Sequence, residues 1–321
     1  MKKQGSLKDY LQIARFDHWI KQLFIVPGIV FAIALTIDIN LITDIISFKL
    51  GLDLLLGFIA TCLIASANYV INEWLDAEFD KYHPTKKSRT ALASYLRARY
   101  VFLEYTILAA LGLISAYFVS LQVLVCCLAL LIMGIFYNVK PFRTKEVAYL
   151  DVLSESINNP IRLMIGWFII APVYLPPITI VLGYWMGGAF LMAAKRYAEY
   201  RMINDEKTAA LYRKSFEKYT QESLLISAFF YALAAVFFCG IFMIKYKIEL
   251  LLAILPLCGL FCYYLKISYK SDSAAQKPEK LFKEKGLMIY VLLLIIIFGV
   301  LMFINIPILE SLLDTTLIGT I

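Results

Sequence analysis

Residues 52–80 read LDLLLGFIATCLIASANYVINEWLDAEFD. The first two thirds of this stretch are mostly apolar, which is long enough for a helix that crosses the roughly 30 Å hydrocarbon core of a membrane. Polar residues then recur at every fourth position, as Asn68, Asn72, Asp76 and Asp80. If the helix continues through them, these side chains form one ridge that leads out of the membrane.

The whole chain has the composition of an integral membrane protein. Of its 321 residues, 61% are hydrophobic and only 17% are charged, whereas soluble domains are about 45–50% apolar and about 25% charged. No sizeable soluble domain fits beside so many apolar residues. Apolar segments recur along the chain and predict an all-α, polytopic fold of about nine transmembrane helices. The segments are 20–37, 52–73, 100–120, 122–137, 149–171, 177–195, 223–244, 249–266 and 286–309.

Basic residues are distributed asymmetrically between the connections. Of the 31 lysines and arginines, 27 lie in the N-terminal arm or in alternate loops. Because cytoplasmic loops carry the excess of basic residues, we expect a multi-pass protein of the cell membrane with the N-terminus in the cytoplasm and the C-terminus outside. We expect one transmembrane domain over residues 1–321, with active-site loops at about 74–99, 138–148 and 196–222 that open to the cytoplasm.

The cysteines and histidines indicate no zinc site. All six cysteines lie inside apolar segments, where they are typical small core residues. The two histidines, His18 and His83, lie in the N-terminal arm and the first large loop, without cysteines close to them in the sequence.

The acidic end of residues 52–80 predicts a magnesium site. Asp76 and Asp80 are one helical turn apart, so their charges repel unless a cation lies between them. Asn72 adds an oxygen one turn earlier, and hard oxygen ligands are those that Mg²⁺ prefers. Magnesium held by one or two carboxylates usually also binds substrate phosphates, so a phosphorylated or pyrophosphorylated substrate is implied. The alternative is a solvated, acidic helix end.

A second group of polar residues follows the fourth apolar segment. It begins with Tyr137, Lys140 and Arg143, and continues into the next apolar segment with residues that share a helical face by their spacing. We expect a metal-binding or phosphate-binding wall here, or alternatively a structural ion pair between Glu155 and Arg162. Pro160 and Gly166 are expected to kink this helix. The residues that share the face are Asp151, Glu155, Asn158 or Asn159, and Arg162.

Three further clusters lie at the same predicted membrane surface. The segment Arg15–Lys21 precedes the first apolar segment, the basic turn His83–Arg89 follows the acidic ridge, and Lys195–Glu199 ends the sixth segment. Cations close to an acidic, metal-binding ridge are the counter-charge that a departing pyrophosphate needs. Taken singly, each cluster is also explained by the ordinary excess of basic residues in cytoplasmic loops.

At these residues the sequence resembles the UbiA superfamily of intramembrane prenyltransferases. The first signature of that superfamily, Asn-Asp-x-x-Asp-x-x-x-Asp, matches Asn72 to Asp80 except that Glu73 replaces the first aspartate. The resemblance implies a nine-helix fold around a central cavity and a pyrophosphate-displacing transferase that uses Mg²⁺.

Within that superfamily the chain resembles the polyprenyl-phosphate phosphoribosyltransferases, which make decaprenyl-phosphoribose. This branch carries an Arg-x-x-x-Trp-x-Lys arm, a His-Pro-Thr-Lys-x-x-Arg loop and a Lys-Arg-Tyr-x-Glu helix end, seen here from Arg15, His83 and Lys195 onward, and Tyr219–Glu222 is also similar. Three features depart from this branch. Thr90 stands where the branch has proline, and the run Ser156–Pro160 matches neither branch. Asp151 and Glu155 form an Asp-x-x-x-Glu pair, which favours an ordinary prenyltransferase.

The resemblance implies phosphoribosyl transfer from phosphoribosyl pyrophosphate to a polyprenyl phosphate, with no nucleic-acid partner. The alternative enzyme moves a prenyl group from a prenyl diphosphate to an aromatic or other apolar acceptor. A secondary transporter of an anionic metabolite and a lipid-binding scaffold are alternatives of other classes. The expected catalytic and metal-binding residues are Asn72, Asp76 and Asp80. The expected substrate-binding residues are Lys21, Asn68, Lys86, Arg89, Tyr137, Lys140, Arg143, Asp151, Glu155, Asn158, Arg162, Lys195, Arg196 and Glu199.

Overall fold

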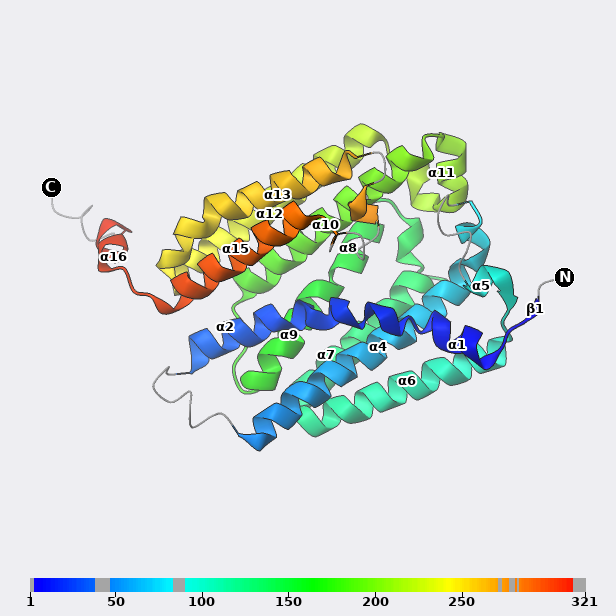
Figure 1. The fold of residues 1–321 in the computed structure, drawn as a ribbon, viewed down its shortest axis with the longest axis horizontal. Coiled ribbons are helices and arrows are strands. Elements are labelled where there is room, and N and C mark those ends of the chain that lie inside the picture. The colour runs from blue at the N-terminus through cyan, green and yellow to red at the C-terminus, as the bar shows by residue number, and fades with distance from the viewer. Residues whose placement is uncertain are drawn as a thin grey trace. The chain divides into compact units, whose positions relative to one another are not determined.

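The computed structural model describes residues 3–37, 47–82, 90–270, 273–276, 281 and 283–313. Almost all of these residues are helical, which confirms the predicted all-α fold (Figure 1). The described part of the chain has one short parallel strand pair, between β1 (Lys3–Gln4) and β2 (Ser94–Tyr95), with Lys3 opposite Ser94. This pairing ties the N-terminal arm to the segment that precedes the third apolar helix.

The described residues form two compact units, of which the first consists of residues 1–176 and 199–224. Its helices are α1 (Leu7–Ile13), η1 (Phe16–Ile25), α2 (Val26–Thr36), α4 (Phe48–Asp80), α5 (Thr90–Ala93), α6 (Ala98–Val119), α7 (Leu121–Asn138), η3 (Thr144–Glu146), α8 (Leu150–Ser156), α9 (Asn158–Ile170), α11 (Glu206–Tyr212) and η4 (Lys214–Glu217). The long helix α4 packs against α6 and α7, and α2 packs against α9.

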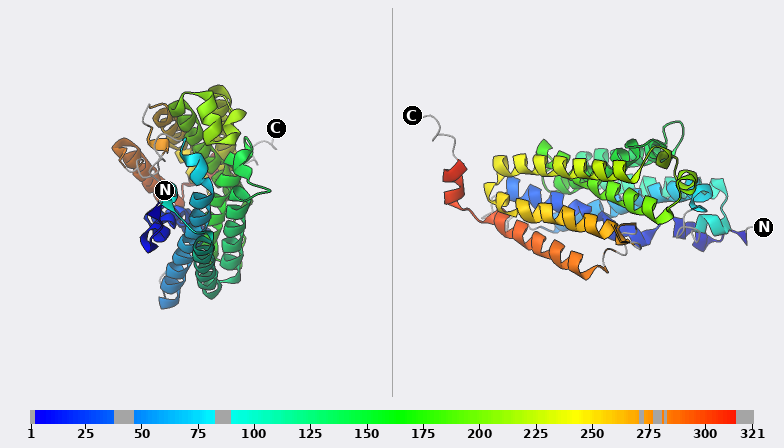
Figure 2. Two further views of the ribbon diagram at one scale, coloured as in Figure 1. Left: turned by 90° about the vertical axis from the view of Figure 1, so that its right-hand side faces the viewer. Right: turned by 90° about the horizontal axis from the view of Figure 1, so that it is seen from above.

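The second unit consists of residues 177–198 and 225–321. Its helices are η5 (Ile248–Ala253), α13 (Ile254–Ser268), η6 (Ala274–Gln276), α15 (Lys285–Phe303) and α16 (Pro307–Leu313). It also contains most of α10 (Ile178–Ile203) and of α12 (Gln221–Tyr246), two helices that run on into the first unit. Helices α13 and α15 lie side by side (Figure 2), and the Tyr290 hydroxyl donates a hydrogen bond to the carbonyl oxygen of Pro256 between them (2.9 Å).

Eight stretches of the described chain are long and apolar enough to cross a membrane. The remaining predicted segment, 149–171, is helical as well, but it is divided into α8 and α9 at Ile157. Pro160 explains the division, because a proline removes one helical hydrogen bond and its ring collides with the carbonyl group four residues earlier, here that of Ser156. The predicted interruption of this segment is therefore confirmed at Pro160.

Gly166 has a different role from the predicted kink. Helix α9 continues through it to Ile170, and the glycine instead permits close contact with the first helices of the chain. A Cβ atom on Gly166 would lie 2.0 Å from the carbonyl oxygen of Ile25, and one on Gly28 would lie 1.9 Å from that of Leu163. Two glycines thus allow the backbones to touch, as small residues commonly do between membrane helices.

Helix α4 runs without a break from Phe48 to Asp80. The predicted ridge from Asn68 to Asp80 is therefore helical along its whole length, and the expected loop at 74–99 begins several residues later than predicted. The ridge carries its polar side chains out of the apolar part of α4 and toward the end of α7.

Candidate active site

Asp76 is the centre of a buried charge cluster in the first unit. Its Oδ1 accepts hydrogen bonds from Lys145 Nζ and from Arg143 Nη2, the latter at 3.1 Å. Its Oδ2 accepts one from Asn72 Nδ2 at 3.2 Å, one helical turn earlier on α4. The side chains of Lys145 and Arg143 are only 5% and 8% exposed, so both cations are largely removed from water.

The end of α7 supports this cluster from the opposite side. Asn138 donates a hydrogen bond to Gly134 O through Nδ2 (2.9 Å), and its Oδ1 accepts bonds from Asn72 Nδ2 (2.6 Å) and Lys145 Nζ (2.8 Å). Arg143 has a left-handed backbone conformation (φ 33°), and its Nη1 donates to Asn138 O at 2.8 Å. The loop after α7 therefore turns back so that both cations meet the carboxylate of Asp76.

The cluster contains closely spaced charges of both signs. Burial lowers the pKa of Lys145 from its ordinary value to about 8, the positive charge of Arg143 acts in the same direction, and the carboxylate of Asp76 opposes them. The charge of Arg213 acts on Lys145 as well. Three cations thus lie near the end of α4, and each is close to a carboxylate of the chain: Arg143 and Lys145 to Asp76, and Arg213 to Asp151.

Arg213 reaches this region from the segment after α11. Its Nη1 donates to the Tyr137 hydroxyl at 3.4 Å, and its Nε is buried without a hydrogen-bond partner in the described part of the chain. Burial lowers the pKa of Arg213. The neighbouring Tyr137, Tyr212 and Glu199 raise it by more than burial lowers it, so the pKa lies above its ordinary value. Arg213 therefore remains a cation. Glu199 is wholly buried and accepts a hydrogen bond from the Tyr212 hydroxyl at 3.5 Å.

Asp151 is held by the same segment. The carboxylate is completely buried at the start of α8 and accepts hydrogen bonds from the Tyr219 hydroxyl (2.8 Å) and from Ser215 Oγ (3.2 Å). Arg213 Nη1 lies 3.8 Å from its Oδ2. The Tyr219 hydroxyl also accepts a bond from the backbone N–H of Tyr149. Asp151 therefore fastens residues 213–219 over the start of α8.

Removing the Tyr219 hydroxyl is expected to loosen this fastening. Tyr219→Phe leaves one oxygen of the buried Asp151 carboxylate and the N–H of Tyr149 short of a partner, which costs about 1–3 kcal/mol. We expect a lower thermal unfolding midpoint in detergent and faster proteolytic cleavage between residues 204 and 222. The matched control is Tyr95→Phe, whose ring is 60% exposed. Equal cleavage rates for the two variants would contradict the assigned role of Tyr219.

A second polar cluster joins η1 to α9. We call it the inner cluster, and it consists of Gln22, Asn158, Asn159 and Arg162. Arg162 Nε donates to Gln22 Oε1 at 2.7 Å, and its Nη1 lies 3.4 Å from Asn159 Oδ1. Asn158 Nδ2 donates to the backbone oxygen of Glu155 at 3.0 Å. Arg162 is thus bonded to Gln22 and Asn159 and not in the structural ion pair with Glu155 that was the alternative expectation.

The N-terminal arm and α4 hold other predicted site residues. Lys21 Nζ and Arg15 Nη2 each lie 2.8 Å from a ring nitrogen of His18, whose ring packs edge-on against Tyr69. Asn68 donates a hydrogen bond from Nδ2 to the backbone oxygen of Leu130 at 2.9 Å, which joins α4 to α7. These contacts describe where the residues lie; their predicted substrate-binding roles stay predictions.

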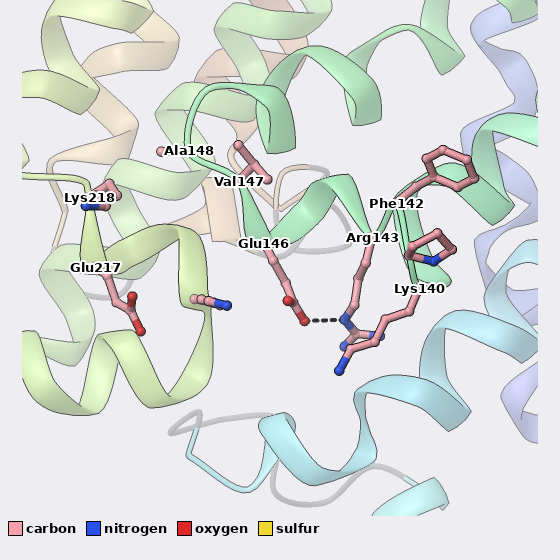
Figure 3. Close-up of a pocket in the computed structure, with 10 residues that line it drawn as sticks. Lys140, Phe142, Arg143, Glu146, Val147, Ala148, Glu217 and Lys218 are labelled. Atoms are coloured by element: carbon pink, nitrogen blue, oxygen red, sulfur yellow. Dashed lines mark hydrogen bonds and ion pairs between the residues drawn. The ribbon is translucent and has the colours of Figure 1, made fainter.

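A pocket of about 450 Å³ opens beside the charge cluster, between residues 140–148 and 214–218. Lys140 and Arg143 line one side and Glu217 and Lys218 the other (Figure 3). Arg143 also forms an ion pair with Glu146 at this edge. The pocket has a mixed but mainly basic lining, and it shares Arg143 with the charge cluster.

The structure brings together some predicted site residues and leaves others elsewhere. Asn72, Asp76 and Arg143 meet in one cluster, and Lys145 Nζ lies 5.7 Å from the centre of the Tyr137 ring. Asp80 is buried in the last turn of α4. Lys195 and Arg196 belong to the second unit and not to this cluster. Lys86 and Arg89 lie outside the described residues, as does His83.

Several residues of the cluster were not predicted from the sequence. Lys145, Asn138 and Arg213 were not among the predicted site residues, although Asn138 directly follows Tyr137. Lys145 and Arg213 lie in basic loops, where the positive-inside rule explains any cation equally well. Only the return of the loop after α7 toward α4 separates Lys145 from its neighbours, and no spacing along the chain indicates that return.

Asn72, Asp76 and Asp80 offer oxygen atoms of the kind that magnesium prefers, although both oxygens of Asp76 accept hydrogen bonds from the chain itself. The described residues contain no group of three or more His, Cys, Asp and Glu side chains placed to hold a metal. Asn72 uses its amide nitrogen for two hydrogen bonds, so its oxygen is the atom that it would offer together with Asp76 and Asp80. Magnesium typically takes one or two carboxylates and completes its coordination with water and phosphate oxygens.

Relatives of known name share part of their sequence with the chain. A decaprenyl-phosphate phosphoribosyltransferase of Mycolicibacterium smegmatis is 27% identical over 236 residues, which cover 67% of this chain and 63% of the relative. One of Mycobacterium tuberculosis is 29% identical over 182 residues, which cover 53% of this chain and 54% of the relative. The chain thus matches between about half and two thirds of the length of these curated relatives.

Solved structures share the fold. A UbiA homolog from Archaeoglobus fulgidus bound to GPP and Mg²⁺ superposes with a TM-score of 0.67 at 18% identity, covering 92% of this chain and 100% of that chain. A digeranylgeranylglyceryl phosphate synthase superposes with a TM-score of 0.60 at 20% identity, covering 92% and 98%. The model of the UbiA prenyltransferase family matches residues 23–284, which is most of the chain. The chain is therefore a member of the UbiA prenyltransferase family, as its sequence motifs predict.

Proposed function

We propose that this integral membrane protein transfers a 5-phosphoribosyl group from phosphoribosyl pyrophosphate to a polyprenyl phosphate, as a step in the synthesis of a cell-envelope glycolipid precursor. The observation that carries the proposal is the buried cluster in which Arg143 and Lys145 meet Asp76 at the end of α4. Its charge suits a pyrophosphate group, and the named relatives at 27% and 29% identity support a phosphoribosyl donor.

The reaction breaks one bond and forms one bond at a single carbon. The bond between the anomeric carbon and the pyrophosphate oxygen breaks, and the electron pair leaves with the pyrophosphate. A phosphate oxygen of the polyprenyl phosphate forms the new bond to the same carbon. Because this oxygen is already anionic, no residue has to remove a proton from it. The main task of the protein is to stabilise the charge that develops on the departing pyrophosphate.

Arg143, Lys145 and Arg213 supply that stabilisation. Their positions are fixed by bonds to Asp76, Asn138 and Tyr137, so little reorganisation accompanies the reaction. The buried Nε of Arg213 offers one further N–H to an incoming anion. Asp76, Asp80 and Asn72 would hold Mg²⁺, which neutralises pyrophosphate charge when it is bound.

The acceptor is expected to approach from the membrane. Its anionic head would lie at the cytoplasmic mouth and its tail in the lipid, with Lys21 of the first unit as a candidate ligand of the head. The predicted orientation, with the mouth in the cytoplasm, gives phosphoribosyl pyrophosphate access from water, and the pocket beside Arg143 offers the route.

A second candidate function is prenyl transfer from a prenyl diphosphate to an apolar acceptor. The observation that favours it is the likeness in fold to the Archaeoglobus fulgidus homolog bound to GPP and Mg²⁺. The pair Asp151 and Glu155 was the reason to expect a second metal in that reaction. The carboxylate of Asp151 is instead bonded to Tyr219 and Ser215, which weighs against a second metal there.

A choice of donors separates the two candidates. Purified protein in detergent with Mg²⁺ receives radiolabelled phosphoribosyl pyrophosphate and a polyprenyl phosphate, and a parallel sample receives labelled prenyl diphosphate and an aromatic acid. We expect lipid-extractable product with labelled ribose in the first sample only, and none in either sample when EDTA removes the metal. Labelled product confined to the second sample would overturn phosphoribosyl transfer.

A further inference from the structure

The inner cluster contains two buried polar atoms that have no hydrogen-bond partner in the described part of the chain: Gln22 Nε2 and Asn158 Oδ1. Gln22 is 0% exposed and lies in η1, where the chain enters the first apolar segment. Buried polar atoms in native proteins almost always have a partner, so two such atoms in one cluster require an explanation.

The contacts of the two amides determine which atom of each is left over. Gln22 receives a hydrogen bond from Arg162 Nε at 2.7 Å, and because a guanidinium only donates, the atom that faces it must be the amide oxygen. Asn158 faces the backbone oxygen of Glu155 at 3.0 Å, and because a carbonyl only accepts, that atom must be the amide nitrogen. The remaining atoms are therefore one donor, on Gln22, and one acceptor, on Asn158.

These two atoms belong to the same small region. Asn158 precedes Arg162 by four residues on α9, so their side chains are neighbours on one face of the helix. Arg162 in turn binds Gln22 directly. The unpartnered donor thus belongs to a residue bonded to Arg162, and the unpartnered acceptor to a residue one helical turn before it.

The inner cluster lies beside α4, because η1 and α9, which carry its residues, both pack against that helix. Tyr69 of α4 contacts His18 of η1, with 5.4 Å between the ring centres. It precedes Asp76 by seven residues, which places the two on one face of α4 at a separation of about 10 Å along the axis. A ligand that binds at Asp76 and extends along α4 toward its apolar part would approach the inner cluster.

The chemistry of the two atoms selects among ligands. A prenyl chain offers neither a donor nor an acceptor, so it would leave both atoms unsatisfied. A phosphate oxygen would accept a bond from Gln22 but would be repelled by the oxygen of Asn158. A hydroxyl group donates and accepts at once, and a pair of sugar hydroxyls satisfies both atoms.

We propose that Gln22 and Asn158 bind the ribose hydroxyls of the donor and thereby make the enzyme specific for a sugar pyrophosphate over a prenyl diphosphate. The proposal rests on the proposed function, since it assigns a sugar-binding role beside the pyrophosphate site. Gln22 and Asn158 are specificity-determining residues and take no part in the bond changes. Arg162 is a positioning residue that fixes the orientation of the Gln22 amide.

The test uses Gln22→Glu, which replaces the free N–H donor by an acceptor and keeps an oxygen for Arg162. Full-length protein in lipid nanodiscs is titrated by calorimetry with three probes: ribose 5-phosphate, 2-deoxyribose 5-phosphate and inorganic pyrophosphate with Mg²⁺. We expect Gln22→Glu to weaken ribose 5-phosphate binding about tenfold, as one lost hydrogen bond does, and to leave pyrophosphate binding unchanged. Asn158→Leu is expected to behave in the same way.

Thr61→Val is the matched control, because the Thr61 hydroxyl is also buried in a membrane helix but is satisfied by Gly57 O at 2.8 Å. It should bind all three probes as the wild type does. The wild type is expected to prefer ribose 5-phosphate to the deoxy compound. This preference should be lost when Gln22 or Asn158 is changed. Equal loss of sugar and pyrophosphate binding in Gln22→Glu, or unchanged sugar binding in both variants, would overturn the proposal.

Failure of the proposed function has a different signature. If sugar binding depends on Gln22 and Asn158 but phosphoribosyl pyrophosphate is never consumed, the hydroxyl site stands and the assigned reaction is wrong. If phosphoribosyl pyrophosphate is consumed but Gln22→Glu retains the wild-type KM for it, the reaction stands and the hydroxyl site is wrong.

Discussion

Asp76→Asn is expected to reduce pyrophosphate release by at least about 10²- to 10³-fold, the usual cost of removing one group that stabilises developing charge. Asparagine keeps the shape of the side chain but removes the negative charge that orders Arg143 and Lys145. It also removes the carboxylate expected to bind magnesium. Steady-state kinetics with a coupled pyrophosphate assay measures the effect.

Asp53→Asn is the matched control for this change. Asp53 lies on the same helix and also pairs with a lysine, with 2.6 Å between Lys49 Nζ and its Oδ2, but Lys49 is 76% exposed and the pair is far from the ridge. Exposed pairs of this kind contribute at most about 1 kcal/mol to stability, and we expect wild-type turnover. Wild-type turnover by Asp76→Asn would show that the chemistry takes place elsewhere.

Gly28→Ala is expected to destabilise the first unit by about 3 kcal/mol or more, at the upper end of the cost of overpacking a core. The new Cβ atom would lie 1.9 Å from the backbone oxygen of Leu163, which is not the flexible end of a side chain. Helices α2 and α9 must therefore move apart, and Gln22 and Arg162 with them. Thermal unfolding in detergent, followed by tryptophan fluorescence, measures the loss.

Gly299→Ala serves as the comparison, because nothing lies within 4 Å of a Cβ atom at that helical position. Alanine is preferred to glycine in helices by up to about 1 kcal/mol, so this variant should unfold at the same or a slightly higher temperature. If the two variants unfold at the same temperature, the backbones of α2 and α9 are not in the close contact described here.

Most of the fold follows from periodic and local features of the sequence. The apolar segments predict every long helix. The spacing of four residues between the polar side chains from Asn68 to Asp80 correctly extends α4 beyond its apolar part. Pro160 predicts the break between α8 and α9, because its effect on the helix is local. Gly166 was misinterpreted as a kink because a glycine required by a neighbouring helix cannot be distinguished by sequence from one that bends its own helix.

The site was predicted where its residues are close in sequence. Asn72 and Asp76 lie on one helix, and Arg143 was expected beside them because it follows an apolar segment on the same side of the membrane. The contact of Lys145 with Asp76 joins residues 69 positions apart and depends on the left-handed turn at Arg143. Gln22 was not predicted at all, since its partner Arg162 is 140 positions away.

The arrangement at Asp76 also revises the expected reason for the acidic ridge. The sequence suggested that two neighbouring carboxylates require an added cation. In the structure Asp76 meets two cations of the chain itself, so its charge is compensated before any ligand binds. A pyrophosphate ligand would then share these cations with Asp76, and its departure would return them.

A double-label experiment tests the proposed reaction most directly. Phosphoribosyl pyrophosphate carries one phosphorus isotope in its 5-phosphate and another in its pyrophosphate, and is incubated with the purified protein, Mg²⁺ and a polyprenyl phosphate. Cleavage at the anomeric carbon predicts that the 5-phosphate label enters the lipid phase while an equal amount of the pyrophosphate label is released into water. Retention of both labels in water, or entry of the pyrophosphate label into the lipid, would contradict pyrophosphate displacement by a lipid phosphate.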